Sequence, residues 1–344
     1  MNKPFYNKED SLMLKGIAIT MMLILHFIPM LDMCKFCIAI FSLISGYSYY
    51  FNPNKTYRYS LSRIGKLCKV FFIVFALYIL VAVVFMGKRY TPWTLVKDML
   101  TDETVIYAWY VRFYVVLMLI VPASIKIIKK PMVRLISIIV FSFILYGFAE
   151  FFSESINVHL YRFIASLALW TPAFFLGFSM GEYELLEKAN RLVSSVFSTL
   201  WVRRTVLLLI CFLSLFVIYD FDVLDGFGIF TVAIKAIKGL VFGTACFTSM
   251  VLLCKETSIT VVRKVLAALG RESTYMWLLQ SIFFNYEGIL IHYVMYLGFI
   301  PIRSFPRNLI VITLWCIFLC YLVSLAIRLA VDWSSKKAAK LFRS

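Results

Sequence analysis

The sequence has no polar stretch long enough to fold as a separate soluble domain, and it has no tandem repeat. Of its 344 residues, 62% are hydrophobic, and the mean hydropathy is +0.88. Soluble domains are not this apolar, and several apolar runs reach the roughly 20 residues that a membrane-spanning helix requires. The alternating runs of about ten residues that are typical of a membrane barrel are also missing. The sequence therefore predicts an all-α, polytopic membrane helix bundle.

Metal-binding patterns are equally scarce. The eight cysteines are scattered, mostly within apolar runs, and Cys34 and Cys37 form a single CxxC pair without a second one. A lone CxxC is weak support for a metal or redox site, because free cysteine usually packs as a small hydrophobic side chain. We therefore expect no metal site and no permanently bound cofactor.

The first apolar run also lacks the small-residue cleavage site of a signal peptide. It continues into Asp32 and Lys35 and then into a second apolar run, so we expect a retained helix. The sequence ends shortly after its last apolar run. We therefore expect one membrane domain, residues 1–344, which carries any chemistry itself.

Acidic residues are few: 18 aspartates and glutamates stand against 35 lysines and arginines, which gives a net charge of +17. Most of these cations fall in alternate segments between the apolar runs, as in residues 55–69 and 126–134. This asymmetry is the positive-inside pattern, and it places both termini in the cytoplasm. It also explains most of the net charge, so we expect no nucleic-acid partner. The ten predicted spans are 13–30, 36–51, 68–86, 105–125, 133–152, 163–181, 205–221, 228–254, 273–297 and 308–331.

The first span carries a cation and a histidine on one face. Lys15 and His26 are eleven residues apart. A helix turns about 100° and rises about 1.5 Å per residue, so the two lie within about 20° of one face and about 16 Å apart along the axis. Ionisable groups in a membrane helix are costly and usually functional. The structural alternative is a histidine that is hydrogen-bonded to a neighbouring helix or wetted at the outer interface.

Further polar groups follow at the predicted cytoplasmic side. Arg63 and Lys66 are three residues apart and form one basic ridge on a helix, which either anchors the topology or binds phosphate groups. Ser45 and Tyr47 flank a glycine in the second span, where small residues allow close helix packing. Such a position also suits a residue that faces a cavity.

A third group of candidates lies toward the outer side. Trp109, Tyr110 and Tyr114 open the fourth span with Arg112 among them. Aromatic residues at an interface are normally a membrane belt, but an arginine within the belt is less ordinary. Glu287 lies in the ninth apolar run, where it either orients His26, contacts an acceptor or lies close to the outer interface.

Taken in order, these motifs resemble the acyltransferase 3 family of integral membrane acyltransferases. The family has a basic residue followed by Gly-Ile-Ala-Ile and a histidine eleven residues on, then Ser-Gly-aromatic, Arg-x-x-Arg, an aromatic helix ending in proline, Phe-Leu-Gly and Leu-Gly-x-x-Ser. The similar stretches here are residues 15–26, 44–47, 63–66, 109–122, 175–177 and 269–273. The sequence departs from the pattern at Lys15 and Lys66, where the family more often has arginine, and at Gln280, where it often has histidine.

The resemblance implies transfer of an acyl group, usually acetyl from cytosolic acetyl-CoA, to a hydroxyl of a cell-surface glycan or its lipid-linked precursor. His26 is then a general base or a transient acyl carrier, and Lys15 is the second residue assigned to catalysis. Donor binding is implied for Arg63, Lys66, Ser45 and Tyr47. Acceptor binding is implied for Trp109, Tyr110, Arg112, Tyr114 and Glu287, with Tyr47 as a further candidate.

A transporter or flippase of lipid-linked glycan, with His26 as a proton relay, is the main alternative function. A non-catalytic membrane scaffold is a weaker one. A flippase should have a central cationic cavity open to both sides, whereas Lys15, Arg63 and Lys66 are all predicted at one side of the membrane. We therefore expect an acyltransferase in a bacterial cell membrane, with an acyl-CoA donor, a glycan acceptor and the lipid bilayer as its partners.

Overall fold

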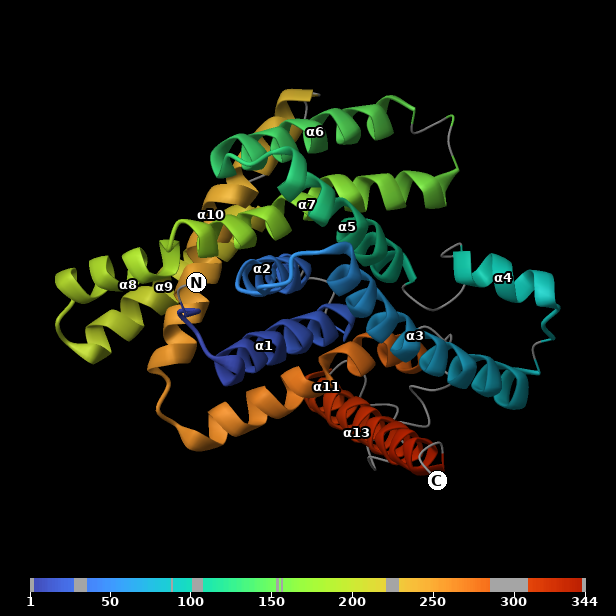
Figure 1. The fold of residues 1–344 in the computed structure, drawn as a ribbon. Coiled ribbons are helices and arrows are strands. Elements are labelled where there is room, and N and C mark those ends of the chain that lie inside the picture. Colours follow the sequence, from blue (N-terminus) through green and yellow to red (C-terminus); the bar gives the residue numbers. More distant parts are fainter. Residues whose placement is uncertain are drawn as a thin grey trace.

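The structure is a computed structural model, and it describes residues 3–27, 36–87, 89–100, 108–152, 155, 157–220, 229–284 and 309–341. This described part contains only helices, turns and loops, as predicted for an all-α protein (Figure 1). The helices are α1 (Lys8–Phe27), α2 (Phe36–Tyr50), α3 (Tyr57–Met86), α4 (Pro92–Leu100), α5 (Ala108–Ile127), α6 (Pro131–Phe151), α7 (Val158–Glu182), α8 (Leu185–Val196), α9 (Leu200–Asp220), α10 (Ile229–Glu256), α11 (Thr260–Phe284) and α13 (Leu309–Leu341).

Local sequence signals account for several helix ends. Thr56 caps α3, because its side-chain oxygen accepts a hydrogen bond from the backbone N–H of Tyr59. Gly87 ends α3 in the left-handed conformation, with φ of 60°, which glycine adopts without strain. Pro131 begins α6, where its missing N–H costs no helical hydrogen bond.

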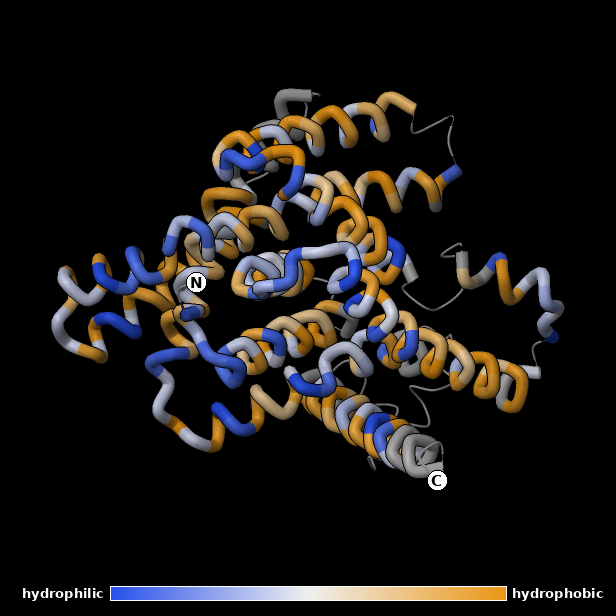
Figure 2. The backbone as a smooth tube through the Cα atoms, in the orientation of Figure 1, coloured by the Kyte–Doolittle hydropathy of each residue, from blue (hydrophilic) through white to orange (hydrophobic). Residues whose placement is uncertain are grey.

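Seven of the described helices contain a segment long and apolar enough to cross a membrane. These segments lie in α3, α5, α6, α7, α9, α10 and α13, and α2 is a shorter apolar helix. Large hydrophobic side chains such as Val84, Ile144 and Leu314 are exposed on the outer faces, as in a lipid-facing bundle. Figure 2 shows this hydrophobic surface along α3 and α6, with hydrophilic residues gathered near the N-terminus. The count of ten spans and the cytoplasmic location of both termini stay predictions.

Two predicted spans are parts of longer helices. The span predicted at 68–86 belongs to α3, which begins at Tyr57, and the one predicted from residue 273 belongs to α11, which begins at Thr260. Hydropathy alone misses these starts because the first turns of both helices are rich in polar residues. Arg63 and Lys66 therefore lie within a continuous helix.

Glycine residues bring α1 and α11 into backbone contact. A Cβ atom added at Gly16 would collide with the carbonyl oxygen of Leu266, and one at Gly270 would collide with that of Leu12. Only glycine allows this close approach. Both glycines belong to motifs singled out in the sequence, so these motifs fix a helix crossing.

The pair α2 and α7 repeats this arrangement. A Cβ atom at Gly46 would collide with the carbonyl oxygen of Phe174, and one at Gly177 would collide with that of Leu43. Because of these two crossings, α1 and α2 lie at the centre of the bundle, between α6 and α7 on one side and α11 and α13 on the other (Figure 1).

The scarce carboxylates mostly join helices to one another. Buried or half-buried ion pairs of this kind lose much stability if one partner is removed, because the other charge is left unpaired. The pairs are Arg263 with Glu9 and Asp10, Arg134 with Glu182, Arg203 with Glu256, and Arg328 with Glu272.

Candidate functional site

A cavity of about 340 Å³ lies between α1, α2, α3, α5 and α11. We call it the basic cavity, because three of its lining residues are cationic. Lys15 comes from α1, and Arg63 and Lys66 come from α3, so the structure brings together the three cations that the sequence predicts at one side of the membrane. The described lining residues are Lys15, Phe41, Ser45, Arg63, Lys66, Leu67, Val70, Tyr110, Tyr114, Ser273, Thr274, Trp277 and Leu278.

The basic cavity carries a net positive charge. Among the described residues that line it there is no carboxylate, because the nearby Glu272 is buried against Arg328, with distances of 2.7 and 2.9 Å from its oxygens to the arginine Nε. Three cations close together in a partly buried site repel one another, and an anion relieves this repulsion. By its charge, the cavity is suited to bind an anion.

Neutral phenol groups hold Arg63. The hydroxyl of Tyr114 accepts a hydrogen bond from Arg63 Nε at 3.1 Å, and the hydroxyl of Tyr59 accepts one from Nη1 at 3.4 Å. The side chain is thus oriented without its charge being neutralised. A fixed guanidinium group with full charge suits a phosphate ligand, because its planar fork matches phosphate oxygens. Tyr114, which the sequence predicts as an acceptor-binding residue, lines the cavity, and its hydroxyl contacts Arg63.

Hydroxyl and aromatic groups complete the lining. Ser273 and Thr274 come from α11, one turn after Gly270, and Ser45 comes from α2. Trp277 stacks on Tyr110, with ring centroids 4.1 Å apart. Sequence reasoning did not select these three residues of α11 as site residues. Their one signal was their position: Ser273 is the last residue of the Leu-Gly-x-x-Ser motif, and Thr274 and Trp277 follow it. This position becomes informative only once α11 is known to cross α1 there.

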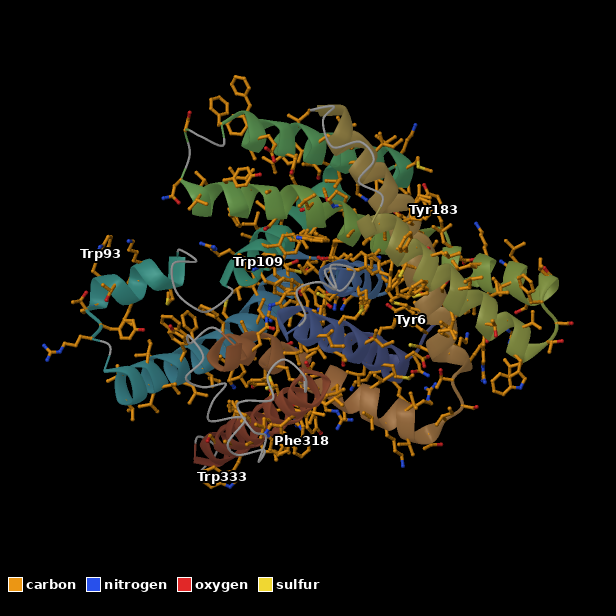
Figure 3. All side chains as sticks on the ribbon, turned by 180° about the vertical axis from the view of Figure 1, so that it is seen from behind. Tyr6, Trp93, Trp109, Tyr183, Phe318 and Trp333 are labelled. Carbon is orange, nitrogen blue, oxygen red and sulfur yellow. The ribbon has the colours of Figure 1, made fainter. Side chains whose placement is uncertain are left out.

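Two predicted acceptor residues, Trp109 and Arg112, are not among the described residues that line the basic cavity. Trp109 packs edge to face on Trp277, with ring centroids 6.5 Å apart, and Figure 3 shows Trp109 inside the bundle, whereas Trp93 and Trp333 lie at its periphery. The guanidinium group of Arg112 lies over the ring of Phe163 on α7, 5.7 Å from its centroid.

Tyr47 faces the N-terminal segment instead of the basic cavity. Its hydroxyl accepts a hydrogen bond from the backbone N–H of Phe5 at 2.9 Å, and its ring stacks on Tyr6 at 4.5 Å. Burial raises the pKa of the Tyr6 phenol well above its usual range, so this group stays neutral. The neighbouring Ser45, two residues earlier on α2, points to the cavity. Tyr47 therefore holds the N-terminal segment, at Phe5 and Tyr6, against α2.

His26 is the penultimate residue of α1, and its side chain lies outside the described part of the structure, as does Glu287. The helix direction is nevertheless clear. Lys15 lines the basic cavity, and α1 then continues by about 16 Å to His26. One turn before His26, the sulfur of Met22 accepts a hydrogen bond from Gln280 Nε2 at 3.6 Å. The far half of α1 thus still faces α11.

The comparisons with known proteins bear on this arrangement. The sequence matches the family described as "Acyltransferase domain", Acyl_transf_3, over residues 13–329. No curated protein and no solved structure matches the chain. The family match covers nearly the whole chain, including α1 with Lys15 and every helix that lines the basic cavity. The chain therefore belongs to the acyltransferase 3 family and is a membrane acyltransferase.

Proposed function

We propose that the protein is an O-acetyltransferase of a bacterial cell membrane that moves an acetyl group from cytosolic acetyl-CoA to a hydroxyl of a cell-surface glycan or its lipid-linked precursor. The basic cavity carries this proposal. Its described lining has three cations and no carboxylate, which suits a donor that bears several phosphate groups, and the family supplies acyl transfer as the reaction class. The hydroxyls of Ser45, Ser273 and Thr274 add hydrogen-bond donors for phosphate oxygens.

The spacing along α1 supports a division of roles. Lys15 lies with the donor's phosphates, and His26 is about 16 Å further along the same helix. An extended donor bound by its phosphates has the length to bring its thioester toward His26. A neutral imidazole near pH 7 then accepts the proton of the attacking hydroxyl. The hydroxyl oxygen bonds to the acetyl carbonyl carbon, the carbon–sulfur bond breaks, and CoA leaves as a thiolate that takes up a proton.

A covalent route uses the same residues. An imidazole nitrogen of His26 attacks the acetyl carbonyl carbon, the carbon–sulfur bond breaks, and CoA leaves as a thiolate that takes up the proton of the other ring nitrogen. The sugar hydroxyl then attacks the acetyl group, its proton passes to the imidazole, and the nitrogen–carbon bond breaks. The two routes differ in one observable: only the covalent route leaves labelled acetyl on the protein when acceptor is absent. Rapid acid quenching of the purified protein with labelled acetyl-CoA distinguishes them.

The proposal is tested by mass analysis of surface glycans from cells with and without the protein. We expect glycans that are heavier by one acetyl group per modified sugar only when the protein is present. Unchanged glycan masses, together with proton-coupled movement of lipid-linked glycan across vesicles, would instead support the transporter alternative.

Replacing Arg63 with alanine is expected to raise the KM for acetyl-CoA about tenfold or more, because a hydrogen bond to a charged group contributes about 1.5–3 kcal/mol. The reaction rate at saturating donor should change less. The matched control is Arg58→Ala, which removes the same charge from an exposed position of α3 outside the cavity lining. Equal KM values for the two variants would show that Arg63 only anchors the topology.

Tyr114→Phe removes the hydroxyl that orients Arg63 and keeps the ring. We expect a smaller rise in the KM for acetyl-CoA, about three- to tenfold, because one net hydrogen bond contributes about 0.5–1.5 kcal/mol. In the double variant with Arg63→Ala, the loss of this hydroxyl should add little, since its partner is already gone. Full additivity of the two effects would show that Tyr114 acts on the substrate directly.

A further inference from the structure

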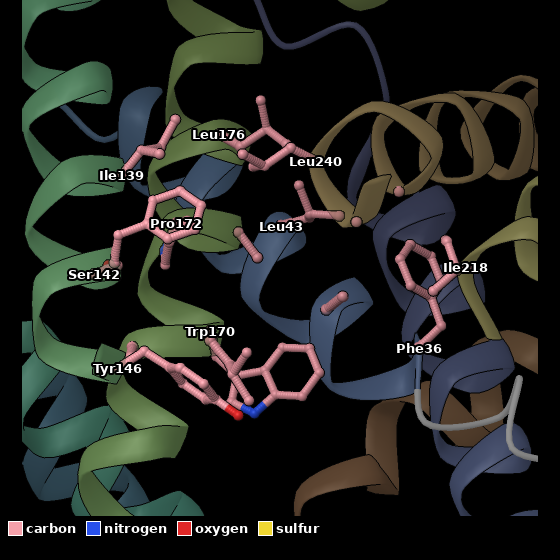
Figure 4. Close-up of a pocket in the computed structure, with 17 residues that line it drawn as sticks. Phe36, Leu43, Ile139, Ser142, Tyr146, Trp170, Pro172, Leu176, Ile218 and Leu240 are labelled. Carbon is pink, nitrogen blue, oxygen red and sulfur yellow. The ribbon is translucent and has the colours of Figure 1, made fainter. Parts of the chain in front are cut away.

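A second pocket, of about 270 Å³, is lined by residues of α2 other than those that line the basic cavity. Figure 4 shows this second pocket. We call it the apolar pocket. Side chains from α2, α6, α7, α9 and α10 line it, and none of the described lining residues is charged. Its walls include Phe36, Leu43, Ile139, Leu176, Ile218 and Leu240. A pocket with such walls suits a hydrocarbon chain.

The two sites use opposite faces of one helix. Phe41 and Ser45 face the basic cavity, whereas Ala39 and Leu43 face the apolar pocket. A shift of two residues corresponds to about 200° around a helix. The backbone contacts at Gly46 and Gly177 also close the space between α2 and α7. A chain attached to the donor therefore has no passage between α2 and α7 into the apolar pocket at this level.

The apolar pocket instead communicates with the outer, lipid-facing surface of the bundle. Leu169, which lines it, is 51% exposed, and Val241 beside its α10 wall is 58% exposed. Exposed hydrophobic side chains on a membrane helix contact lipid. A hydrocarbon chain bound in this pocket would therefore come from the bilayer.

One end of the apolar pocket is polar. Figure 4 shows the hydroxyl of Tyr146 and the indole nitrogen of Trp170 at the same end. Tyr146 also lies beside Glu150 and Tyr161, and the hydroxyl of Tyr161 donates a hydrogen bond to Glu150 at 2.7 Å. This end lies in the last third of α6, which the predicted topology places toward the outer side. A carboxylate there repels phosphate and accepts hydrogen bonds from hydroxyls.

We propose that the apolar pocket binds the hydrocarbon chain of a glycolipid acceptor from the outer leaflet, with its first sugar at the Tyr146 and Trp170 end. This inference rests on the proposed function, in which a glycan accepts the acetyl group. Neutral hydrogen-bonding groups and aromatic faces suit a sugar ring, whereas the phosphate of a phospholipid would lie close to Glu150 with no cation among the described lining residues. The glycolipid that fits this end therefore carries its first sugar on the hydrocarbon chain without a phosphate link. The glycan is then modified while it is attached to a lipid.

The test is photo-crosslinking of the full chain in phosphatidylcholine vesicles. Three probes carry the same diazirine-bearing hydrocarbon chain on different head groups: an alkyl glycoside, a phosphatidylethanolamine and an acyl-CoA. We expect the glycoside probe to label peptides of α6, α7 and α10 at least about tenfold more than the other two probes do. A few well-placed hydrogen bonds to the sugar raise the binding affinity by about this factor. Equal labelling by phosphatidylethanolamine would show ordinary boundary lipid, and preferential labelling by acyl-CoA would show a donor site; either result overturns the proposal.

Gly239→Leu supplies the matching variant. Gly239 lines the pocket, and a Cβ atom added there meets no atom within 4 Å, so the leucine fills the pocket without a backbone clash. We expect glycoside labelling to fall more than about tenfold, because displacing two methylene groups weakens binding about fourfold for each. Val311→Leu is the control, since it enlarges an exposed residue of α13, none of whose described residues lines the pocket. Undiminished labelling of Gly239→Leu would overturn the proposal, and Gly239→Ala, with less added bulk, checks the result if the leucine variant folds poorly.

Failure here and failure of the proposed function give different results. Photo-crosslinking measures binding without any acetyl transfer. If glycan acetylation is confirmed but the glycoside probe does not label, the acceptor binds elsewhere. If the probe labels but no acetyl transfer occurs, the pocket stands and the reaction assignment falls.

Discussion

Replacing His26 with alanine should reduce acetyl transfer to glycan by about 10²- to 10⁴-fold while the protein stays in the membrane at normal abundance. The reason is chemical: alanine has no nitrogen to accept the hydroxyl proton or to carry the acetyl group. Because Lys15, Arg63 and Lys66 remain in place, the KM for acetyl-CoA should change little. Activity is measured with the purified protein in vesicles and radiolabelled acetyl-CoA.

Two further variants sharpen this test. His26→Gln keeps a polar side chain of similar reach but cannot take up a proton near pH 7, so it should be as inactive as the alanine variant. His159→Ala removes another histidine, in the first turn of α7, and should retain full activity. If His26→Ala transfers acetyl at the normal rate, His26 has no catalytic role.

Gly270→Val should give the largest loss of stability of any single substitution considered. The carbonyl oxygen of Leu12 occupies the space of the new Cβ atom, and backbone atoms cannot move aside as the end of a flexible side chain can. Overpacking in a well-packed core costs about 1–3 kcal/mol, and a collision with backbone lies at or above the top of that range. We expect a clear fall in the thermal unfolding temperature in detergent.

The same substitution also tests how the site is assembled. Ser273 and Thr274 follow Gly270 by one turn, so forcing α11 away from α1 should widen the basic cavity and weaken donor binding in whatever protein remains folded. Gly65→Val is the matched control, because a Cβ atom at Gly65 meets nothing within 4 Å. Equal destabilisation by both variants would show that the crossing of α1 and α11 contributes nothing special to the fold.

The parts of this site that the sequence predicts are those fixed by membrane topology. Charge asymmetry assigns a side of the membrane to each segment, so Lys15, Arg63 and Lys66 are predicted at one end although they lie on two helices. The all-α membrane fold is likewise predicted from the long apolar runs. The glycine motifs are visible as well, but the sequence does not say which helix each one contacts.

The remaining features depend on packing between distant segments. Thr274 and Trp277 join the basic cavity only because α11 crosses α1, which hydropathy does not encode. The role of Tyr114 as a hydrogen-bond acceptor for Arg63 depends on the packing of α5 beside α3. Tyr47 illustrates the opposite case: a tyrosine beside a motif glycine looks like a cavity residue, yet the N-terminal segment packs against it.

The described lining of the basic cavity has three cations and no carboxylate, and this has a consequence for the metabolism of the cell. Under the proposed function, its cations contact only phosphate groups, and these are identical in acetyl-CoA and in the free CoA that leaves after the reaction. The product therefore competes with the next donor molecule for the same site. The rate of surface modification should follow the ratio of acetylated to free CoA in the cytosol, which links the chemistry of the outer surface to the supply of carbon inside.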